Sequence, residues 1–369
     1  MQTRAGICWE IGSKWSVENV ELDEPKAGEV LVKLAASGLC HSDDHAVTGD
    51  MPCGLPIVGG HEGAGVVEAV GPGVTRVQPG DHVVLAFIPS CGHCRFCMSG
   101  MANLCDVGAM IMGGMGIDGT PRTHAQGKDL SRMTGLGTFS PYAVVHEYST
   151  VKIDDDLPLD LAALIGCGVT TGFGSAVNTA EVRPGDTVAV VGVGGIGAAA
   201  IQGARIAGAE QIIAIDPVPW KLDQAKIFGA THGAASMEEA VPLLQELTRG
   251  VMADKAILTV GVAKGEHIGP LMSLVRKGGI TVVTAVANWM EANANLNLFE
   301  LTIWQKQIRG SLYGESAPQV AVPQLLNLYR RGLLQLDEMV TRRYTLDEVQ
   351  QGYDDMHAGR NIRGLITYD

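Results

Sequence analysis

Four cysteines in the first third of the chain have the spacing of a metal site. Two, two and seven residues separate successive members of the set, which consists of Cys91, Cys94, Cys97 and Cys105. Four thiolates this close together can complete a tetrahedral shell around Zn2+ and leave no position open, so they predict a structural zinc rather than a catalytic one. Close cysteine runs also bind iron–sulfur clusters, and unrelated free thiols are the simplest alternative. Zinc is favoured because no other part of the sequence indicates electron transfer.

A glycine-rich segment that begins at residue 192 predicts a dinucleotide site. It follows the apolar run Thr187–Val191 and precedes a stretch of small residues that is typical of a helix. In such a strand–turn–helix the first glycine makes the tight turn, the second admits the pyrophosphate, and the third lets helix and strand pack closely. The phosphates then face the N–H groups at the start of the helix. The candidate cofactor residues of this turn are Gly192, Gly194, Gly195, Ile196 and Gly197.

Two polar residues after the glycine turn are candidates for contact with the cofactor ribose. Asp216 lies 19 residues after Gly197, at the end of the next predicted strand, and Lys221 follows five residues later. A carboxylate at that place accepts hydrogen bonds from the ribose hydroxyls and repels a 2′-phosphate, so it favours NAD over NADP. An ordinary strand-end acid and a surface lysine are the alternatives.

A third set of residues could form a metal site with a vacant position. Cys40, His61 and Cys167 come from three separated points of the chain. Two thiolates and one imidazole can hold Zn2+ with its fourth position open, and such an ion beside a nicotinamide is a Lewis acid that stabilises an alkoxide. Spacing alone supports this set weakly, because a lone buried cysteine is usually a small apolar core residue.

The elements that would position these residues form two kinds of pattern. Before residue 168, short apolar strands at 29–34, 65–70 and 82–87 are bounded by turn residues, which predicts a partial β-barrel. Residues 106–138 have no clear period and predict a long surface loop. From about residue 169, strands at 187–191, 211–215, 256–260 and 279–284 alternate with helices near 195–207, 221–228, 237–249 and 266–276. That alternation predicts a parallel, doubly wound sheet.

The expected fold class is therefore α/β, with two domains. A partial-barrel catalytic domain would span 1–168 with its structural zinc lobe, a Rossmann domain would span 169–311, and 312–369 would return to the catalytic domain. The active site would lie in the cleft between the two domains.

Composition excludes several classes of function. The 369 residues include 27 basic and 40 acidic side chains, and the net charge of -13 disfavours binding to nucleic acid, including binding through a zinc ribbon. The sequence has no uncharged apolar run of about 18 residues, so no membrane span is predicted. The N-terminal sequence is not that of a secretory signal. A cytoplasmic protein is expected, in which the eight cysteines serve as thiols or metal ligands rather than disulfides.

The order of these motifs resembles the zinc-dependent medium-chain alcohol dehydrogenases. The motifs are GLCHSD, GGHEGAG, CGHCRFC with a later cysteine, GCGVTTG and GVGGIG, and together they cover essentially the whole chain. Within that family, VTGDMPCGLPIVGGHEGAGVVE, VKIDDDLPLDLAALIGCGVTTGFGSAVNTAEVRPGDTV and the insertion at 106–138 are similar to the nicotinoprotein-type branch assayed with N,N-dimethyl-4-nitrosoaniline. The resemblance implies a GroES-like catalytic domain and a Rossmann cofactor domain.

The resemblance also implies roles for residues around two zinc ions. Glu62 would sit behind the catalytic metal and tune its coordination, and Asp43 would hydrogen-bond a ligand imidazole. The catalytic zinc ligands would be Cys40, His61 and Cys167, and the structural zinc ligands would be Cys91, Cys94, Cys97 and Cys105.

Further implied roles concern the proton and the cofactor. Ser42 would accept the substrate hydroxyl proton and pass it through the nicotinamide ribose to His45 and solvent. His41 takes the place of a basic residue near the pyrophosphate, where a partly charged imidazole would give a weaker or pH-dependent grip. Thr171 would pack under the nicotinamide, and Arg363 would reach the cofactor phosphates. A turn serine and a surface histidine are the plain alternatives for the relay pair.

The implied activity is the reversible oxidation of primary or secondary alcohols to aldehydes or ketones by hydride transfer to NAD. The branch implies NAD that stays bound and is reoxidised in place, a mycofactocin-type electron acceptor, and a homodimer or homotetramer. A thiol-dependent formaldehyde dehydrogenase of the same superfamily is the alternative enzyme. A non-catalytic NAD-binding or structural protein is the alternative from another class.

Overall fold

The computed structural model describes residues 1–368, and these form two compact units. The barrel unit consists of Met1–Cys167, Ala317–Gly332 and Val340–Asp369, and the sheet unit consists of Gly168–Ser316 and Leu333–Met339. The expected division into folding domains at residues 168 and 311 stays a prediction, which limited proteolysis would test.

The barrel unit contains two β-structures. A closed barrel has the strand order β1-β2-β7-β8-β4, formed by Gln2–Cys8, Ser16–Leu22, Thr123–Ala125, Lys128–Arg132 and Ile57–Val58. The second sheet has the order β10-β6-β5-β3-β18-β17, formed by Thr150–Ile153, His82–Leu85, Gly63–Val70, Glu29–Leu39, Arg363–Thr367 and Val340–Tyr344. Strand β9 (Tyr142–His146) also pairs with β3. The predicted β-barrel architecture is confirmed.

Strand β3 is the centre of that second sheet. Val30, Val32 and Leu34 alternate into the core and are at most 1% exposed. The sequence pattern predicted an end at Leu34, but the strand continues to Leu39 because β18 pairs with its second half, where Leu365 lies opposite Gly38. The continuation carries the chain directly into helix α1 (His41–Thr48).

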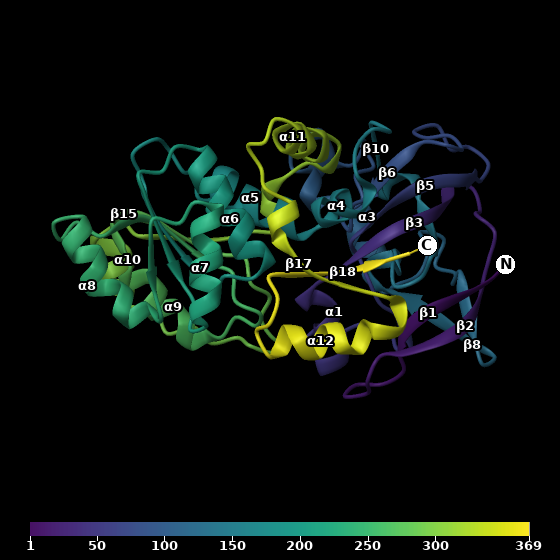
Figure 1. The fold of residues 1–369 in the computed structure, drawn as a ribbon, viewed down its shortest axis with the longest axis horizontal. Helices are drawn as coiled ribbons and strands as arrows, with labels where there is room; N and C mark the ends of the chain where they lie inside the picture. Colours follow the sequence, from purple (N-terminus) through teal and green to yellow (C-terminus); the bar gives the residue numbers. More distant parts are fainter. Residues whose placement is uncertain (369) are drawn as a thin grey trace. The chain divides into compact units, whose positions relative to one another are not determined.

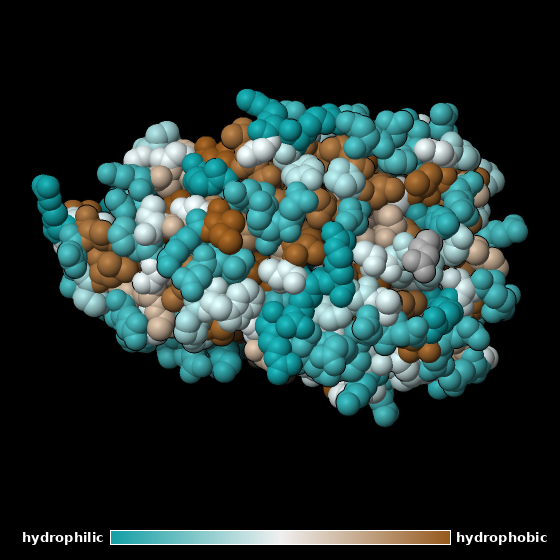
Figure 2. All heavy atoms as spheres, viewed as in Figure 1, coloured by the Kyte–Doolittle hydropathy of each residue, from teal (hydrophilic) through white to brown (hydrophobic). Residues whose placement is uncertain are grey.

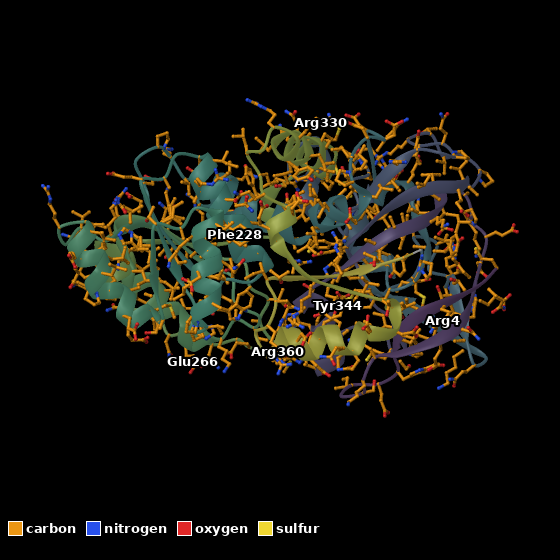
Figure 3. All side chains as sticks on the ribbon, viewed as in Figure 1. Arg4, Phe228, Glu266, Arg330, Tyr344 and Arg360 are labelled. Atoms are coloured by element: carbon orange, nitrogen blue, oxygen red, sulfur yellow. The ribbon has the colours of Figure 1, made fainter. Side chains whose placement is uncertain are left out.

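Helix α4 (Leu159–Ala162) packs against the middle strands β3, β5 and β6 of the second sheet, and Figure 1 shows α1 and α12 side by side. Helix α12 is close to α1, since Nε2 of His357 lies 2.8 Å from Oδ2 of Asp44. On α12, Asp355 accepts hydrogen bonds from the hydroxyl of Tyr344 at 2.9 Å and from the guanidinium of Arg360 at 3.2 Å, two residues labelled in Figure 3. Helix α12 spans Val349–His357. The other helices of the unit are α2 (Arg95–Met98), α3 (Asp106–Ile111), α4 (Leu159–Ala162) and α11 (Pro318–Arg330).

The expectation of an irregular surface loop at 106–138 is wrong. This segment contains α3, and it supplies β7 and β8, which join β2 and β4 to close the barrel. Leu130 and Met133 are at most 2% exposed, whereas Met110 and Met112 remain at the surface. The strands are only three and five residues long and include several polar residues, so pairing with distant partners, rather than a local pattern, makes them strands.

The sheet unit is a parallel sheet of the order β13-β12-β11-β14-β15-β16. The strands span His232–Ala234, Gln211–Ile215, Thr187–Val191, Ala253–Leu258, Val275–Val283 and Gln307–Gly310. The helices are α5 (Gly168–Gly174), α6 (Gly195–Ile206), α7 (Pro219–Phe228), α8 (Met237–Leu247), α9 (Gly265–Ser273) and α10 (Leu298–Ile303). Helix α6 packs with α7, and α8 packs with α9, so the strand order and the helix pairs are those of a doubly wound fold.

Strands β11 and β12 have the predicted bounds, and two others differ. Strand β14 begins at Ala253 rather than 256, because the polar side chains of Asp254 and Lys255 conceal its start. Val275 and Arg276 belong to β15 and not to the preceding helix, which ends at Ser273.

Within the described residues, no single helix is long and apolar enough to cross a membrane. The bent pair Leu159–Gly166 and Gly168–Thr179 passes the same length and composition test only as a pair, and most of its residues are buried. On the face drawn in Figure 2, hydrophilic side chains cover most of the surface and apolar atoms appear in small groups.

Candidate metal and cofactor sites

The four-cysteine set forms one cluster in the barrel unit. The sulfur atoms of Cys91, Cys94, Cys97 and Cys105 all lie within 4.8 Å of one another. Backbone N–H groups of the same loop point at the sulfurs, from Cys94 to Cys91 at 3.3 Å and from Cys97 to Cys94 at 3.4 Å. The N–H of Cys97 is the main cause that lowers the pKa of Cys94 to about 6. Four converging sulfurs with such N–H support fit a tetrahedral zinc.

A second cluster in the same unit brings together the expected ligands of the open site. One donor atom each from Cys40, His61, Glu62 and Cys167 lies within 4.8 Å of the others, and all four residues are buried. Cys40 follows the end of β3, the histidine and glutamate precede β5, and Cys167 follows a 3-10 turn at Ala163–Gly166. Three remote segments therefore meet at one point, and the role of these residues as ligands stays a prediction.

Asp43 orients the imidazole of this cluster. Its Oδ1 accepts a hydrogen bond from the N–H of Gly60 at 2.8 Å and lies 3.1 Å from Nδ1 of His61. With Nδ1 held in this way, Nε2 of His61 is buried without a hydrogen-bond partner. An orphaned nitrogen beside two thiols is the donor set that Zn2+ prefers, so these residues fit the metal. The structure places Asp43 against the imidazole of His61, while its role in supporting a bound metal stays a prediction.

Glu62 is paired with Arg363 behind the two thiols. The guanidinium Nη2 of Arg363 donates a hydrogen bond to Oε2 of Glu62, and both side chains are at most 5% exposed. Burial raises the pKa of Glu62 to about 7, although the charge of Arg363 opposes the shift. Arg363 therefore reaches the metal cluster rather than solvent, while its Nε is buried without a partner. Its contact with cofactor phosphates stays a prediction.

Gly38 makes room for this buried pair and was not identified from the sequence. A Cβ at Gly38 would lie 2.0 Å from Oε2 of Glu62 and 2.9 Å from Nη2 of Arg363. The available signal was a glycine inside a strand, which commonly marks a close approach of other groups. The pattern did not indicate which groups approach.

Helix α1 carries the two residues that were expected to form a proton relay, and that role stays a prediction. Ser42 Oγ lies 3.7 Å from the sulfur of Cys40, at the metal cluster. His45 is three residues further, on the same side of the helix, and its ring is 2% exposed. Burial lowers the pKa of His41, against the opposing charge of Asp44, which favours a neutral imidazole at the position expected near the pyrophosphate.

The glycine turn in the sheet unit has the close contacts that a dinucleotide loop requires. Gly192 has a φ of 98°, and a Cβ there would lie 2.9 Å from the backbone of Thr259 and Val260. A Cβ at Gly197 would lie 1.9 Å from the carbonyl oxygen of Gly192, whereas the space beside Gly194 is open. Helix α6 begins at Gly195 and has no side-chain cap, so the N–H groups of its first turn can face an anion. These features fit a bound pyrophosphate.

The remaining cofactor candidates lie in the same unit. Asp216 is 6% exposed, and its two oxygens accept hydrogen bonds from the N–H groups of Val193 at 2.8 Å and Val218 at 2.9 Å. Lys221 is half-buried in the first turn of α7. Thr171 lies on α5, and its Oγ1 is buried without a hydrogen-bond partner. Asp216 therefore joins the glycine turn to the end of β12, while the roles of Lys221 and Thr171 stay predictions.

The sequence matches two families of dehydrogenase domains. Residues 26–155 match the alcohol dehydrogenase GroES-like domain, and residues 195–331 match the zinc-binding dehydrogenase family.

Individual proteins of known name are similar over the full length. The chain is 50% identical to alcohol dehydrogenase B of Mycobacterium tuberculosis, covering 100% of this chain and 99% of that protein. It is 49% identical to the NDMA-dependent alcohol dehydrogenase of Amycolatopsis methanolica, again covering 100% and 99%. Among solved structures, the alcohol dehydrogenase zinc-binding domain protein from Burkholderia ambifaria superposes with a TM-score of 0.93 at 33% identity, covering 100% of this chain and 99% of that one.

These similarities agree with the donor sets found in the structure, and they confirm the resemblance drawn from the motifs. They also confirm that the chain is an enzyme and that its substrates are small molecules. The chain belongs to the zinc-binding alcohol dehydrogenases of the medium-chain type.

Proposed function

We propose that this protein oxidises primary or secondary alcohols reversibly to aldehydes or ketones, with one catalytic and one structural zinc per chain and with NAD as hydride acceptor. The observation that carries the proposal is the buried cluster of two thiols, an orphaned imidazole nitrogen and a carboxylate at Cys40, Cys167, His61 and Glu62.

The first part of the proposal concerns the metal. Zinc held by Cys40, His61 and Cys167 supplies a Lewis acid that lowers the pKa of an alcohol hydroxyl. Asp43 holds the imidazole through Nδ1 and thereby directs Nε2 to the metal. Glu62, whose carboxylate is engaged by Arg363, adjusts the negative charge that surrounds the ion. The four sulfurs at 91–105 hold the second zinc and stabilise their loop.

The second part concerns the cofactor. NAD supplies the nicotinamide carbon that accepts a hydride. The turn from Gly192 to Gly197 binds its pyrophosphate, and the carboxylate of Asp216 binds the ribose hydroxyls and disfavours a 2′-phosphate. His41 and Arg363 contact the phosphates, Lys221 contacts the ribose, and Thr171 packs under the nicotinamide.

The third part concerns the proton. Ser42 accepts the proton of the alcohol hydroxyl, since its Oγ is beside a metal ligand. His45, one turn along α1, acts as the base that receives the proton. General-base transfer of this kind typically contributes about 10²–10⁴ to the rate.

We also propose that NAD stays bound through turnover and is reoxidised in place, in cells by a mycofactocin-type acceptor. Support comes from the 49% identical relative, which is named NDMA-dependent. The alternative, a thiol-dependent formaldehyde dehydrogenase, would require an added thiol to turn over. An assay of simple alcohols without thiol separates the two.

A homodimer or homotetramer is proposed from the edge of the sheet unit. Strand β16 is the last strand of its sheet, and Ile308 on it is 40% exposed. Nearby in sequence, Trp289, Leu298 and Phe299 are each more than 60% exposed. An unpaired edge beside exposed apolar side chains favours association between copies. Light scattering of the purified protein would measure the number of subunits.

A cytoplasmic location is proposed from cysteine chemistry. All eight cysteines are free in the structure, and six of them belong to the two clusters. Thiolate ligands persist where the compartment keeps them reduced.

The experiment that tests the proposed function combines metal analysis, spectroscopy and an alcohol assay. The expected protein contains two zinc ions per chain, retains NAD after dialysis and oxidises alcohols without thiol. The Cys40→Ser variant should lose one zinc and the activity. A fully active protein with a single zinc would refute the two-metal assignment, and free release of NAD would refute the bound-cofactor part alone.

A further inference from the structure

Asp50 lies against the buried relay histidine and has no part in the function described so far. It follows α1, which ends in a left-handed residue at Gly49 with a φ of 77°. That turn folds the chain back, so that the N–H of Met51 reaches the carbonyl oxygen of His45 at 3.3 Å. The carboxylate of Asp50 is thereby placed beside the imidazole, with its Oδ2 at 3.4 Å from Nδ1.

The carboxylate is held in that position and is partly open to water. The hydroxyl of Thr48 donates a hydrogen bond to the same Oδ2 at 2.6 Å. The side chain of His45 is 2% exposed, whereas that of Asp50 is 19% exposed. Asp50 is therefore a charged group between a buried imidazole and solvent.

From this arrangement we infer that Asp50 is a positioning residue for the relay, acting through His45. A carboxylate that accepts a hydrogen bond from Nδ1–H fixes the tautomer in which Nε2 carries the lone pair and can receive a proton. The same charge stabilises the imidazolium that forms, as the aspartate of a catalytic triad does. One proton arrives at Nε2, one leaves the ring to water or a buffer base, and no electrons move. The inference rests on the proposed function of His45.

His41 and Asp44 also lie near His45, but they are less well placed than Asp50 to hydrogen-bond its ring. The rings of His41 and His45 form a T-shaped contact with 5.4 Å between their centroids. This is an aromatic contact and not a hydrogen bond. Asp44, on the same helix, lies 3.8 Å from Nε2 of His41 and 2.8 Å from Nε2 of His357. Its carboxylate is engaged by these two rings, so Asp50 is the acidic partner of His45.

The test uses the full-length protein with its cofactor and compares Asp50→Asn with Asp44→Asn. Oxidation of a primary alcohol, with N,N-dimethyl-4-nitrosoaniline as the acceptor that reoxidises the bound cofactor, is followed in H2O and in D2O. For Asp50→Asn we expect kcat to fall about tenfold, a fraction of the full effect of general-base transfer, with KM nearly unchanged. The solvent isotope effect should rise, because proton transfer becomes slower relative to the other steps. Added imidazole should restore the rate in proportion to its concentration, and Asp44→Asn, whose carboxylate contacts His41 rather than His45, should leave the solvent isotope effect as in the wild type.

Two further variants separate positioning from folding. Asp50→Glu keeps the charge and should recover most of the rate. Thr48→Val removes the hydrogen bond that holds the carboxylate and should show a smaller loss in the same direction. The inference is overturned if Asp50→Asn matches the wild type, if Asp44→Asn raises the solvent isotope effect instead, or if neither imidazole nor glutamate restores the rate. Failure of the wild-type protein to oxidise any alcohol would refute the proposed function itself, whereas an active wild type with an unaffected Asp50→Asn refutes only the role of Asp50.

Discussion

Substituting Gly38 by alanine tests how tightly the groups behind the open metal site are packed. The new Cβ would lie 2.0 Å from Oε2 of Glu62, whereas ordinary contacts begin at 3.4 Å. The carboxylate would have to move by at least about 1.4 Å, but Glu62 is fully buried and held by Arg363, which is 5% exposed.

The expected cost follows from these contacts. Overpacking of a filled core typically costs about 1–3 kcal/mol. Separating a buried ion pair costs about 3–5 kcal/mol when one charge is left uncompensated. We therefore expect Gly38→Ala to lower the free energy of unfolding by about 3 kcal/mol, and to lower the zinc content of the site formed by Cys40, His61 and Cys167.

The assay combines denaturant unfolding with metal analysis by mass spectrometry. Gly113→Ala is the matched control, since a Cβ there meets nothing within 4 Å and its backbone is not left-handed. The control should behave as the wild type in both measurements. A Gly38→Ala protein with wild-type stability, two zinc ions and full activity would refute the reasoning, because it would mean that the carboxylate can move freely.

Three other predictions concern separate parts of the molecule. Cys94→Ser should release the structural zinc and lower the melting temperature, and metal analysis should find the second zinc retained; loss of both ions together would contradict two independent sites. Asp216→Asn should weaken the binding of NAD more than the binding of NADP, so the ratio of their dissociation constants, measured on protein stripped of bound cofactor, should move toward NADP; an unchanged ratio would assign the discrimination to other residues. Burial lowers the pKa of His124, but the hydrogen bonds that its ring donates to the carboxylates of Asp129 and Asp23 outweigh that effect and raise the pKa. The stabilisation from that group is therefore fully present below about pH 6.5 and is lost as pH rises through the raised value in the folded protein. Because the ring is 30% exposed, the effect should be about 1 kcal/mol or less, and the difference in unfolding free energy between wild type and His124→Gln, measured at about pH 5 and pH 9, should shrink at the higher pH.

Some of the fold could be predicted because its signals are local. Thr187–Val191 is a continuous apolar run buried on both sides of the sheet, and the glycine turn follows it directly, so both were identified with their bounds. The cysteine cluster at 91–105 was equally clear, because ligand spacing within one short loop is readable without the fold.

Other parts depend on partners that are distant in the chain. Strands β7 and β8 have weak patterns of their own and exist because β2 and β4 pair with them. The contact of Gly38 with Glu62 and Arg363 joins three segments that no local pattern connects. The contact of Asp50 with His45 could not be predicted either, because it depends on the left-handed turn at Gly49, which brings the chain back to the histidine.

The pairing of β18 with β3 means that the open metal site can be completed only late in translation. Arg363 begins β18, while Gly38 and Leu39, which immediately precede the first cysteine ligand, end β3. During translation, residues 40, 61 and 167 leave the ribosome long before residue 363 does. A nascent chain can therefore gather its thiols early, but the counter-charge for Glu62 arrives only when nearly all of these 369 residues have been made. Ribosome-bound chains stalled before residue 363 should hold zinc at the 91–105 loop and bind it poorly at the open site.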